Sequence, residues 1–554
     1  MCELGKCPVT DGVRIERATL GTPCMPDGAP RLARSAGLFG LATMASRILG
    51  LVRDQVLAFY FGAGDAMDAF RVAFRIPNLV RDLFAEGAMS AAFVPTFTHE
   101  LTTGGKPRAW ALANSVVTAL ILITGLLAAL GFIFAEPLVR FFADDYSAVP
   151  GKLELTVYLA RIMVPFLTMA ALAAVAMGML NSLGRFFIPA LSPAMFNVAT
   201  IVIALLFIPI APSLGIQPIV LIAIATLIGG VGQVLLQLEP LRREGFSYRP
   251  SFAFKDPAMH RVLLLMGPGT IGMAATQINV LVNTQFASSQ GTGAVSWLDY
   301  AFRLMYLPIG LFGVSIAAAS TPALSRLAAL SDTPKMRSTV GSAIGLMLVL
   351  NIPATIGLIV LAGPIVALIF EHGRFTAADT AATARALQLY ALGLVAYSVV
   401  RIVSPAFYAL RQSQIPVTAS IVSVVVNIAV NVALIRVMGF AGLALGTSLA
   451  AIVNAALQVI LLRRHLGGIE GRQLTITFGK VLAAGLAMGV AAWFAQMELN
   501  QIIPGSSIPM QAVRVAGAIA IGLSVLAAAA SLLRVREFHE AREMVLGRFR
   551  RLRR

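Results

Sequence analysis

Residues 46–95 read SRILGLVRDQVLAFYFGAGDAMDAFRVAFRIPNLVRDLFAEGAMSAAFVP, and this stretch places many charges inside otherwise apolar helical sequence. An ionised side chain surrounded by lipid costs a few kcal/mol or more unless it faces a partner or water. The charged residues within the helical parts of the stretch are Arg47, Arg53, Asp54, Asp68, Arg71, Arg75, Arg81, Asp82 and Glu86. We therefore expect these side chains to line a polar cavity.

The spacing of these charges indicates that many of them share a helix face. At about 100° per residue, one face of the second helix, roughly 60° wide, carries Asp68, Arg71, Arg75, Asp82 and Glu86. Arg81 lies off this face, and the facing of Arg81 stays open because Pro77 is expected to kink the helix. On the first helix Arg47 and Asp54 share a face, with Arg53 about 120° round. The residues alone also allow an alternative, in which structural ion pairs hold helices together.

The composition assigns the chain to the polytopic membrane proteins. It has 554 residues, of which 58% are hydrophobic and only 12% are charged. The chain has a net charge of +17, and a strongly positive charge is also typical of nucleic-acid-binding proteins. Here, however, the basic residues concentrate in alternate short loops and at both ends, as the positive-inside rule expects. We therefore expect an all-α membrane protein with no nucleic-acid partner.

Fourteen apolar segments follow one another, each about long enough to cross a bilayer. They lie near residues 35–61, 66–99, 108–135, 153–182, 189–211, 216–238, 259–288, 294–327, 337–370, 378–411, 415–436, 441–463, 474–498 and 509–533. Basic connections, such as those around Lys106, Arg242 and Arg337, alternate with connections that contain few basic residues, such as 143–151. This alternation predicts that both termini and the hydrophilic 244–257 linker are cytoplasmic and that 143–151 is external.

The two halves of the chain repeat at a shift of 227 residues. This shift relates Pro95 to Pro322, Pro107 to Pro334, Pro137 to Pro364 and Pro189 to Pro416. Because a repeat of six helices keeps its direction in the membrane, we expect two parallel lobes with a cavity between them. The expected organisation is a disordered cytoplasmic tail (1–33), an N-lobe (34–243), a linker (244–257), a C-lobe (258–465), two further helices (466–534) and a basic cytoplasmic tail (535–554). This basic tail is expected either to lie along the membrane surface or to remain solvated, and both alternatives stay open.

Two repeated lobes around a charged cavity are typical of transporters that work by alternating access. An enzyme would need sizeable loops outside the membrane or a metal cluster, and the sequence has no sign of either. The histidines are dispersed at helix ends: His99, His260, His372, His465 and His539. The cysteines all lie in the N-terminal tail without metal-ligand spacing: Cys2, Cys7 and Cys24. We therefore expect a transporter with no metal site and no cofactor.

Three motifs closely resemble those of the bacterial MurJ (MviN) lipid II flippases, members of the multidrug/oligosaccharidyl-lipid/polysaccharide exporter superfamily. They are SRxxGxxRD at 46–54, DAFRVAFRIPNLVRDLFAEGAMSAAFVPTF at 68–97 and VSWLDYAFRLMYLPIG at 295–310. The resemblance implies MATE-like lobes in the cytoplasmic (inner) membrane of a bacterium. It also implies export of undecaprenyl-diphosphate-linked muropeptide, lipid II, to the outer leaflet for cell-wall synthesis, with membrane lipids and cell-wall or division proteins as further partners.

The family's functional residues fall on matching motif positions of this chain. The resemblance assigns substrate binding to Arg47, Arg53, Arg81 and Arg303, with Asp54 and Glu86 beside them, and the charge pattern adds Arg75, Asp68 and Asp299. Many members carry an acid directly before the arginine that corresponds to Arg303, whereas this chain has Phe302 there. Asp299 is the nearest acid, and we expect a local Asp299–Arg303 pair to substitute.

Asn427, Asn431 and Thr447 are candidates for a monovalent-cation site such as some relatives possess. No carboxylate accompanies them, so hydrogen bonding between helices is the alternative. The driving force therefore stays open between such a cation and the membrane potential. Two further functions also stay open: export of drugs or O-antigen-type lipids, and a scaffold that does not transport.

Overall fold

The computed structural model describes residues 29–82, 90–253 and 255–538, and every regular element in these ranges is a helix. Glu86, the three cysteines and the terminal segments 1–28 and 539–554 lie outside the described residues. The first half contains α1 (Ala29–Phe61), α2 (Asp65–Arg81), α3 (Ser90–Thr103), α4 (Gly105–Ile133), α5 (Ala135–Ala143), η2 (Asp144–Ala148), α6 (Lys152–Met163), α7 (Phe166–Ser182), α8 (Phe187–Leu191), α9 (Ala194–Phe207), η3 (Ala211–Leu214) and α10 (Pro218–Arg243). The second half contains α11 (Pro257–Ser288), α12 (Ala294–Pro308), η4 (Ile309–Gly313), α13 (Val314–Ala329), α14 (Thr333–Val360), α15 (Ala362–Phe370), α16 (Ala377–Ala391), α17 (Leu394–Ala409), α18 (Gln414–Met438), α19 (Phe440–Leu466), α20 (Gly471–Ile502) and α21 (Ile508–Leu532).

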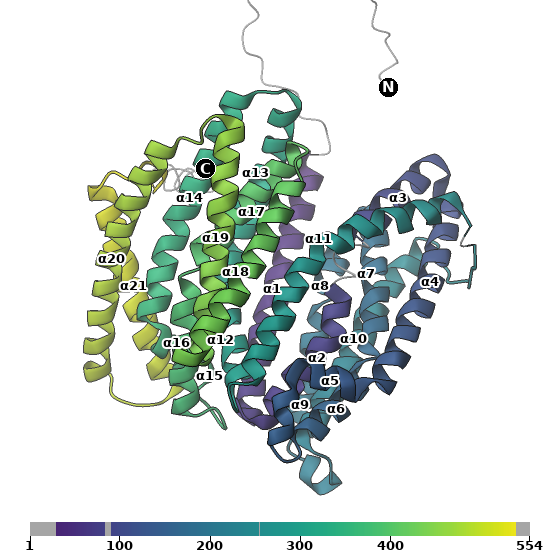
Figure 1. Cartoon of the computed structure of the whole chain (residues 1–554), viewed down its shortest axis with the longest axis horizontal. Coiled ribbons are helices and arrows are strands. Elements are labelled where there is room, and N and C mark those ends of the chain that lie inside the picture. Colours follow the sequence, from purple (N-terminus) through teal and green to yellow (C-terminus); the bar gives the residue numbers. More distant parts are fainter. Residues whose placement is uncertain (1–28, 83–89, 254, 539–554) are drawn as a thin grey trace, which may run out of the picture.

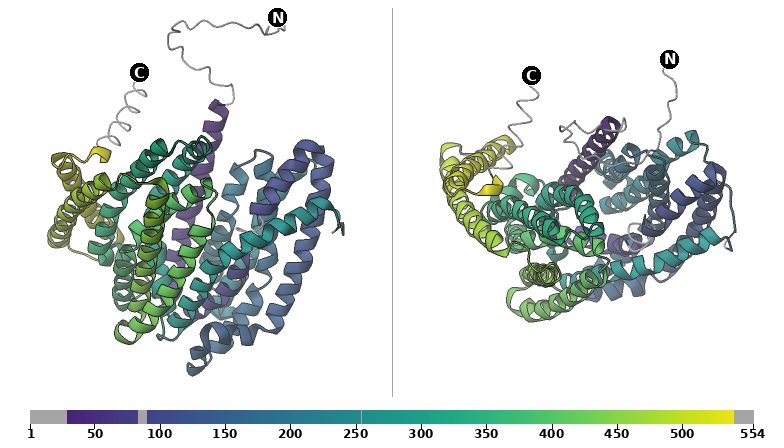
Figure 2. Two further views of the ribbon diagram at one scale, coloured as in Figure 1. Left: turned by 45° about the horizontal axis from the view of Figure 1, so that its top comes forward. Right: turned by 90° about the horizontal axis from the view of Figure 1, so that it is seen from above.

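The helices form two bundles that diverge like the arms of a V (Figure 1). We call α1–α10 the N-bundle and α12–α19 the C-bundle. Helix α11 runs between them and packs against both α3 and α18, so it contacts both bundles although the sequence analysis assigned it to the C-lobe. Helices α20 and α21 pair with each other and pack on α14 and α15 at the outer side of the C-bundle, as Figure 2 also shows.

The expected repeat is visible in the helix boundaries. Helix α5 runs from Ala135 to Ala143, and α15 runs from Ala362 to Phe370, so both ends are 227 residues apart. Each of these short helices follows a long one after a break, at Phe134 and at Leu361. The expected single segment 337–370 is therefore two helices, because the chain breaks at Leu361 as it does at the equivalent position in the first half.

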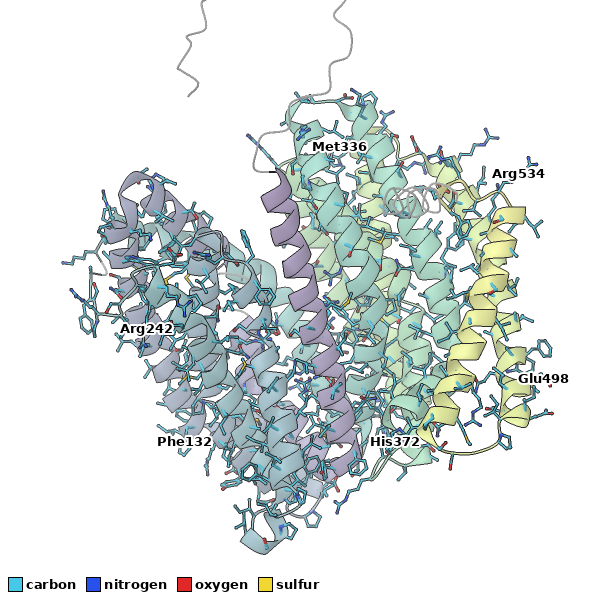
Figure 3. All side chains as sticks on the ribbon, turned by 180° about the vertical axis from the view of Figure 1, so that it is seen from behind. Phe132, Arg242, Met336, His372, Glu498 and Arg534 are labelled. Carbon is cyan, nitrogen blue, oxygen red and sulfur yellow. The ribbon has the colours of Figure 1, made fainter. Side chains whose placement is uncertain are left out.

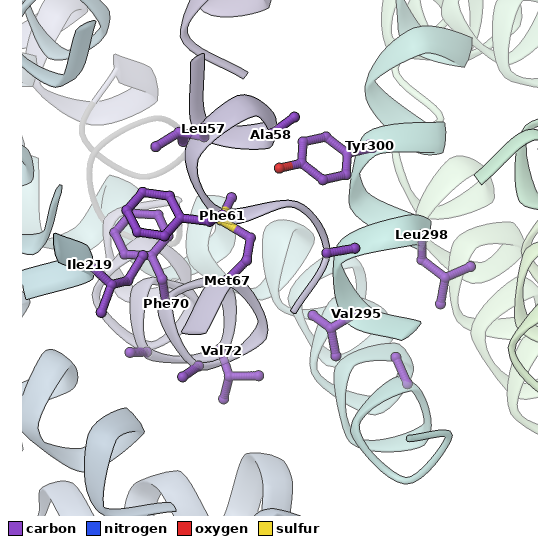
Figure 4. Close-up of a cluster of buried hydrophobic side chains, with 14 of the residues drawn as sticks. Leu57, Ala58, Phe61, Met67, Phe70, Val72, Ile219, Val295, Leu298 and Tyr300 are labelled. Atoms are coloured by element: carbon purple, nitrogen blue, oxygen red, sulfur yellow. The ribbon is translucent and has the colours of Figure 1, made fainter. Parts of the chain in front are cut away.

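The buried apolar side chains show where the bundles are joined. One core cluster contains residues of both bundles, including Leu57 and Phe70 with Val295 and Tyr300, which Figure 4 shows around the end of α1. Two further clusters are separate: one lies within α3, α4, α7, α10 and the start of α11, and the other within α13, α14, α17, α19 and their neighbours. The bundles therefore share a core at one end, the closed end, and diverge at the other, the open end.

Basic connections gather at the open end. At the open end, Glu244 accepts hydrogen bonds from Lys106 at 3.0 Å and from Arg185 at 3.0 Å, which joins three basic connections. These two donors hold the pKa of the Glu244 carboxyl below its usual value. Figure 3 shows Met336 and Arg534 at this end and His372 at the other.

The number of membrane spans can be compared only in part. Within the described residues, nine helices are long and apolar enough to cross a bilayer, or ten if the bent pair α16–α17 counts as one span. The other expected spans contain the charged α1 and α2, α11, and the α12–η4–α13 segment, in which the π-helical turn interrupts the α-helix. The count of fourteen therefore stays a prediction.

A close crossing of α9 and α10 generates the first testable prediction. A Cβ atom added at Gly229 would lie 2.7 Å from the Cα atom of Phe196, and backbone cannot yield as a flexible side chain can. We expect Gly229→Ala to lower the free energy of unfolding by about 1–3 kcal/mol through overpacking. Gly125→Ala, where a Cβ atom meets nothing within 4 Å, is the control. Thermal unfolding of the purified variants is the measurement, and equal melting temperatures would contradict the prediction.

Candidate functional site

A cavity of about 390 Å³ lies where the two bundles diverge. Its charged lining consists of five arginines and two aspartates: Arg53, Arg71, Arg75, Arg81, Arg303, Asp54 and Asp299. All seven come from α1, α2 and α12, which lie at the interface between the bundles. A second cavity of about 370 Å³ adjoins the first, because Asp54 and Arg303 line both.

An ion pair between Asp54 and Arg303 connects the bundles across the cavity. Asp54 on α1 accepts a hydrogen bond from the Nη1 atom of Arg303 on α12 at 2.9 Å. Its other carboxylate oxygen accepts from the Nη2 atom of its neighbour Arg53, also at 2.9 Å. Asp54 is buried, whereas the side chain of Arg303 is 36% exposed and accessible from the cavity. Arg303 therefore has a charged partner in the opposite bundle and an exposed surface of its own.

Asp299 joins three arginines from two helices. Arg303 donates to it from Nε at 2.8 Å, which confirms the local pair that the sequence predicted. Arg71 on α2 forms an ion pair with the same carboxylate, and Arg75 lies 3.9 Å from it. The Arg71 guanidinium also lies over the ring of Tyr300, 4.6 Å from its centroid. Three cations thus share one acid, so their combined positive charge is only partly neutralised.

Arg71 has unused donor capacity at this point. Its Nε and Nη2 atoms are buried without a hydrogen-bond partner among the described residues. A buried polar group without a partner is costly, and an ionised one especially so. An anion in the cavity would supply the missing acceptors.

Two predicted arginines occupy different surroundings. Arg81 lines the first cavity although it lies off the charged face, and it donates to Asp82 from Nη2 at 2.7 Å. Arg47 lines the second cavity with Phe302 and Tyr306. The Arg47 guanidinium lies so close to Gly310 that a Cβ atom there would overlap its Nη1 atom. Arg47 is thus held against the π-helical turn η4, in the cavity lined by α1 and α12.

Asp68, which the charge pattern assigned to substrate binding, does not line either cavity. It is fully buried at the closed end, where it accepts hydrogen bonds from the backbone N–H groups of Gly293 at 2.7 Å and Ser296 at 3.1 Å. The Ser296 hydroxyl donates to it as well, at 2.7 Å. A carboxylate at a helix N-terminus is favoured by the free N–H groups and the helix dipole. Asp68 on α2 therefore holds the start of α12 and joins the bundles. We call these contacts of Asp68 the clasp.

Lys152 on α6 completes this clasp. Its ammonium lies 2.7 Å from Asp65 and 3.2 Å from Asp68, and 4.2 Å from the ring centroid of Tyr146. Nearby, Gly373 must approach the end of α1 closely, because a Cβ atom there would lie 2.3 Å from the carbonyl oxygen of Phe59. Backbone and side-chain contacts together thus close this end of the cavity.

The structure brings most of the predicted site residues together and separates others. Around the first cavity lie Arg53, Arg75, Arg81, Arg303, Asp54 and Asp299; Arg47 lies in the adjoining cavity, and Glu86 lies outside the described residues. Sequence reasoning placed Arg71 on the charged face but left it out of the site, and it missed Lys152. It also missed the neutral residues Asn197, Gln233 and Gln237 on α9 and α10, because single amides in apolar helices give no pattern.

The residues of the candidate cation site form hydrogen bonds within and between helices. Asn431 on α18 donates from Nδ2 to Asn283 on α11 at 2.7 Å and to Asn427 at 3.0 Å. The Thr447 hydroxyl donates to the Leu443 carbonyl within its own helix. These contacts favour the alternative of hydrogen bonding between helices. Cation binding there stays a prediction.

The clasp generates a testable prediction about the closed end. In Asp68→Asn, one carboxylate oxygen becomes an N–H donor that faces other donors, so we expect the closed end to open more often. A reporter cysteine replaces Thr200, a buried cavity residue, in a chain whose three tail cysteines are serine. Labelling by a membrane-impermeant thiol reagent from the closed-end side should accelerate roughly tenfold, as expected for the loss of charge-assisted hydrogen bonds. Glu136→Gln, which removes an exposed acid paired with Arg140, is the control. Unchanged labelling of folded Asp68→Asn protein would exclude the clasp.

Comparisons with known proteins agree with this architecture. Residues 57–513 match the family model described as lipid II flippase MurJ. A Vibrio cholerae protein named probable lipid II flippase MurJ is 35% identical over 514 residues, covering 91% of this chain and 97% of that protein. A Burkholderia cenocepacia protein named lipid II flippase MurJ is 34% identical over 427 residues, covering 76% of this chain and 82% of that protein.

Solved structures show the same similarity. A structure titled lipid II flippase MurJ, inward closed conformation, is 27% identical with a TM-score of 0.73, covering 90% of this chain and 99% of that one. An inward-facing multidrug resistance MATE family transporter shares the fold, with a TM-score of 0.64 at 18% identity, over 79% of this chain and 99% of that one. The matched length and the identity to these relatives show that the chain belongs to the MurJ family of lipid II flippases.

Proposed function

We propose that this chain moves lipid II from the cytoplasmic to the outer leaflet by alternating access through the cavity between its bundles. The observation that carries the proposal is the cavity lining, in which five arginines outnumber two aspartates. Relatives named lipid II flippases that match most of the chain support the identity of the substrate. Flipping moves an intact molecule and breaks no covalent bond, so the proposed role is that of a transporter and not of an enzyme.

The arginines suit the diphosphate of such a lipid. The guanidinium group is planar, donates two parallel hydrogen bonds to a phosphate and stays charged in a site of low dielectric constant. Arg71 has two buried donors without partners, and Arg303 exposes part of its side chain to the cavity. A diphosphate would satisfy these donors and offset the excess positive charge. The lipid tail would remain in the bilayer, so the cavity needs to hold only the headgroup.

The joining of the bundles at one end suits alternating access. The shared core and the Asp68 clasp close one side of the cavity, while the separate cores on the other side let the bundles diverge. Rocking of the bundles would exchange which end is open. The Asp54–Arg303 pair crosses the interface at the level of the cavity, where a bound diphosphate would compete with Asp54 for Arg303.

We assign the open end to the cytoplasm of a bacterial inner membrane, because the basic loops gather there. Both termini and the 244–257 linker are then cytoplasmic, and 143–151 is external. Membrane lipids and cell-wall synthesis or division proteins are the further partners of this proposal. The driving force, either the membrane potential or a monovalent cation, stays a prediction.

Depletion of the protein tests the function directly. The expected result is accumulation of lipid II in the cytoplasmic leaflet, with recovery when the wild-type chain is restored. Arg303→Ala should fail to restore transport while remaining inserted, and Arg303→Lys should restore it only in part, because lysine lacks the bidentate fork. Arg140→Ala, which removes an exposed arginine outside the cavity, should restore it fully.

Other outcomes distinguish the rival functions. A drug or O-antigen exporter predicts that lipid II distribution is unchanged by depletion, and a scaffold predicts that Arg303→Ala complements. Recovery by Arg303→Ala combined with Asp299→Asn would make Arg303 a structural counter-ion. Asp299 also forms an ion pair with Arg71, so the single variant Asp299→Asn must be measured beside the double variant.

The contact between Arg47 and Gly310 generates a separate prediction. A methyl group at position 310 would overlap the end of the Arg47 side chain, which is flexible and can move away. We therefore expect Gly310→Ala to reduce flipping as strongly as Arg47→Ala, with normal expression and melting temperature. Gly313→Ala is the control, because its Cβ atom would make only ordinary contacts of 3.4–3.5 Å. If Gly310→Ala transports normally, the position of Arg47 against η4 has no role in transport.

A further inference from the structure

The lining of the first cavity divides into two chemically different parts. Every ionised side chain comes from α1, α2 and α12, whereas α7, α9, α10 and the turn before α9 contribute only neutral residues. Besides Thr200, whose hydroxyl donates to the Phe196 carbonyl within its own helix, four of these neutral residues carry a hydroxyl or amide group: Ser192, Asn197, Gln233 and Gln237. We call these four residues the neutral wall.

Gln237 on α10 is the centre of the neutral wall, and its orientation is fixed. Its Nε2 atom lies within hydrogen-bond distance of three acceptors: the Ala173 carbonyl at 3.1 Å, the Ser192 hydroxyl at 3.0 Å and the Gln233 carbonyl at 3.1 Å. Exchanging the two amide atoms would turn the oxygen towards two carbonyl groups and is therefore unfavourable. The residue is 99% buried, with a relative exposure of 1%.

The other end of the same amide has no partner. The Oε1 atom of Gln237 accepts no hydrogen bond among the described residues, although the residue lines the cavity. Burying an unpaired acceptor costs free energy. If the residue served only to pack the helices, leucine or methionine would fill the same volume without this cost. A ligand in the cavity that carries an O–H or N–H group would supply the missing donor.

The neutral wall is continuous with the arginines. The Arg53 guanidinium lies over the ring of Phe196 on α9, 5.1 Å from the ring centroid. The next residue, Asn197, donates a hydrogen bond to the Ser46 carbonyl of α1 at 3.1 Å. Small side chains on α7, Ala170, Ala173 and Ala174, line the cavity near the wall. A ligand that reaches from the arginines onto these alanines would carry its charge at one end and neutral polar groups at the other.

We propose that the neutral wall binds the N-acetylated sugars that follow the diphosphate of the substrate. Hydroxyl and acetamido groups are uncharged and both donate and accept hydrogen bonds, as the amides and the hydroxyl of the wall do. The carboxylates of the peptide, by contrast, match the arginines. The Gln237 Oε1 atom accepts a hydrogen bond from the sugar, and the fixed Nε2 end holds it in place. This assignment rests on the proposed function.

Binding to purified protein in nanodiscs tests the assignment with three probes: lipid II, a peptide-free disaccharide analogue of lipid II, and undecaprenyl diphosphate. Gln237→Leu should weaken binding of the first two probes roughly five- to tenfold, the loss expected for one buried hydrogen bond. It should leave binding of undecaprenyl diphosphate unchanged. Arg303→Ala should weaken binding of all three probes.

Gln458→Leu is the matched control, because Gln458 is an equally buried glutamine on α19 that lines neither cavity. Three results would overturn the assignment: equal weakening of all probes by Gln237→Leu, weakening of lipid II alone, which would place the peptide there, or no weakening by a folded variant. Failure of the proposed function would appear differently, as absence of lipid II binding by the wild-type chain.

Discussion

The cost of placing charge in hydrocarbon governs this structure. Side chains such as Asp54, Asp68 and Arg71 occur in the helices of a multi-pass membrane protein, where a charge must face a partner or water. The structure meets this requirement by directing the charges of α1, α2 and α12 to the interface between the bundles, where they pair across it or line a cavity. Most other helices then present apolar side chains outwards, such as Leu126 and Val425, both 61% exposed.

Two kinds of charge result from this arrangement, and they act differently. Asp68 is fully satisfied by the α12 N-terminus and Lys152, so it stabilises one closed end and has no capacity left for a ligand. Arg71 and Arg303 share their acids with other cations, so they retain capacity for an anion. When the closed end opens, the Asp68 carboxylate must exchange its protein donors for others. Such a difference between two arrangements of the bundles can set a conformational equilibrium.

Buried amides line the cavity beside the arginines. Gln237 fixes one end of its amide with three acceptors and leaves the other end without a partner. Helices α9 and α10 cross closely at Gly229, next to Phe196, and Asn197 and Gln233 of these helices line the same cavity. Packing in the N-bundle is thus directly linked to the surface that a headgroup would contact.

The sequence by itself determined the class, the repeat and most helix positions, since apolar length, loop charge and proline spacing are local properties. It also predicted that Arg71 and Arg75 share a face of α2 and that Asp299 pairs with Arg303, because both follow from helical periodicity. Only the tertiary structure decided that Asp68 contacts the start of α12 instead of lining the cavity, that Lys152 pairs with Asp68 and that Gln237 lines the cavity. These outcomes depend on which helices meet, and contacts between residues far apart in the chain leave no periodic signal in either segment.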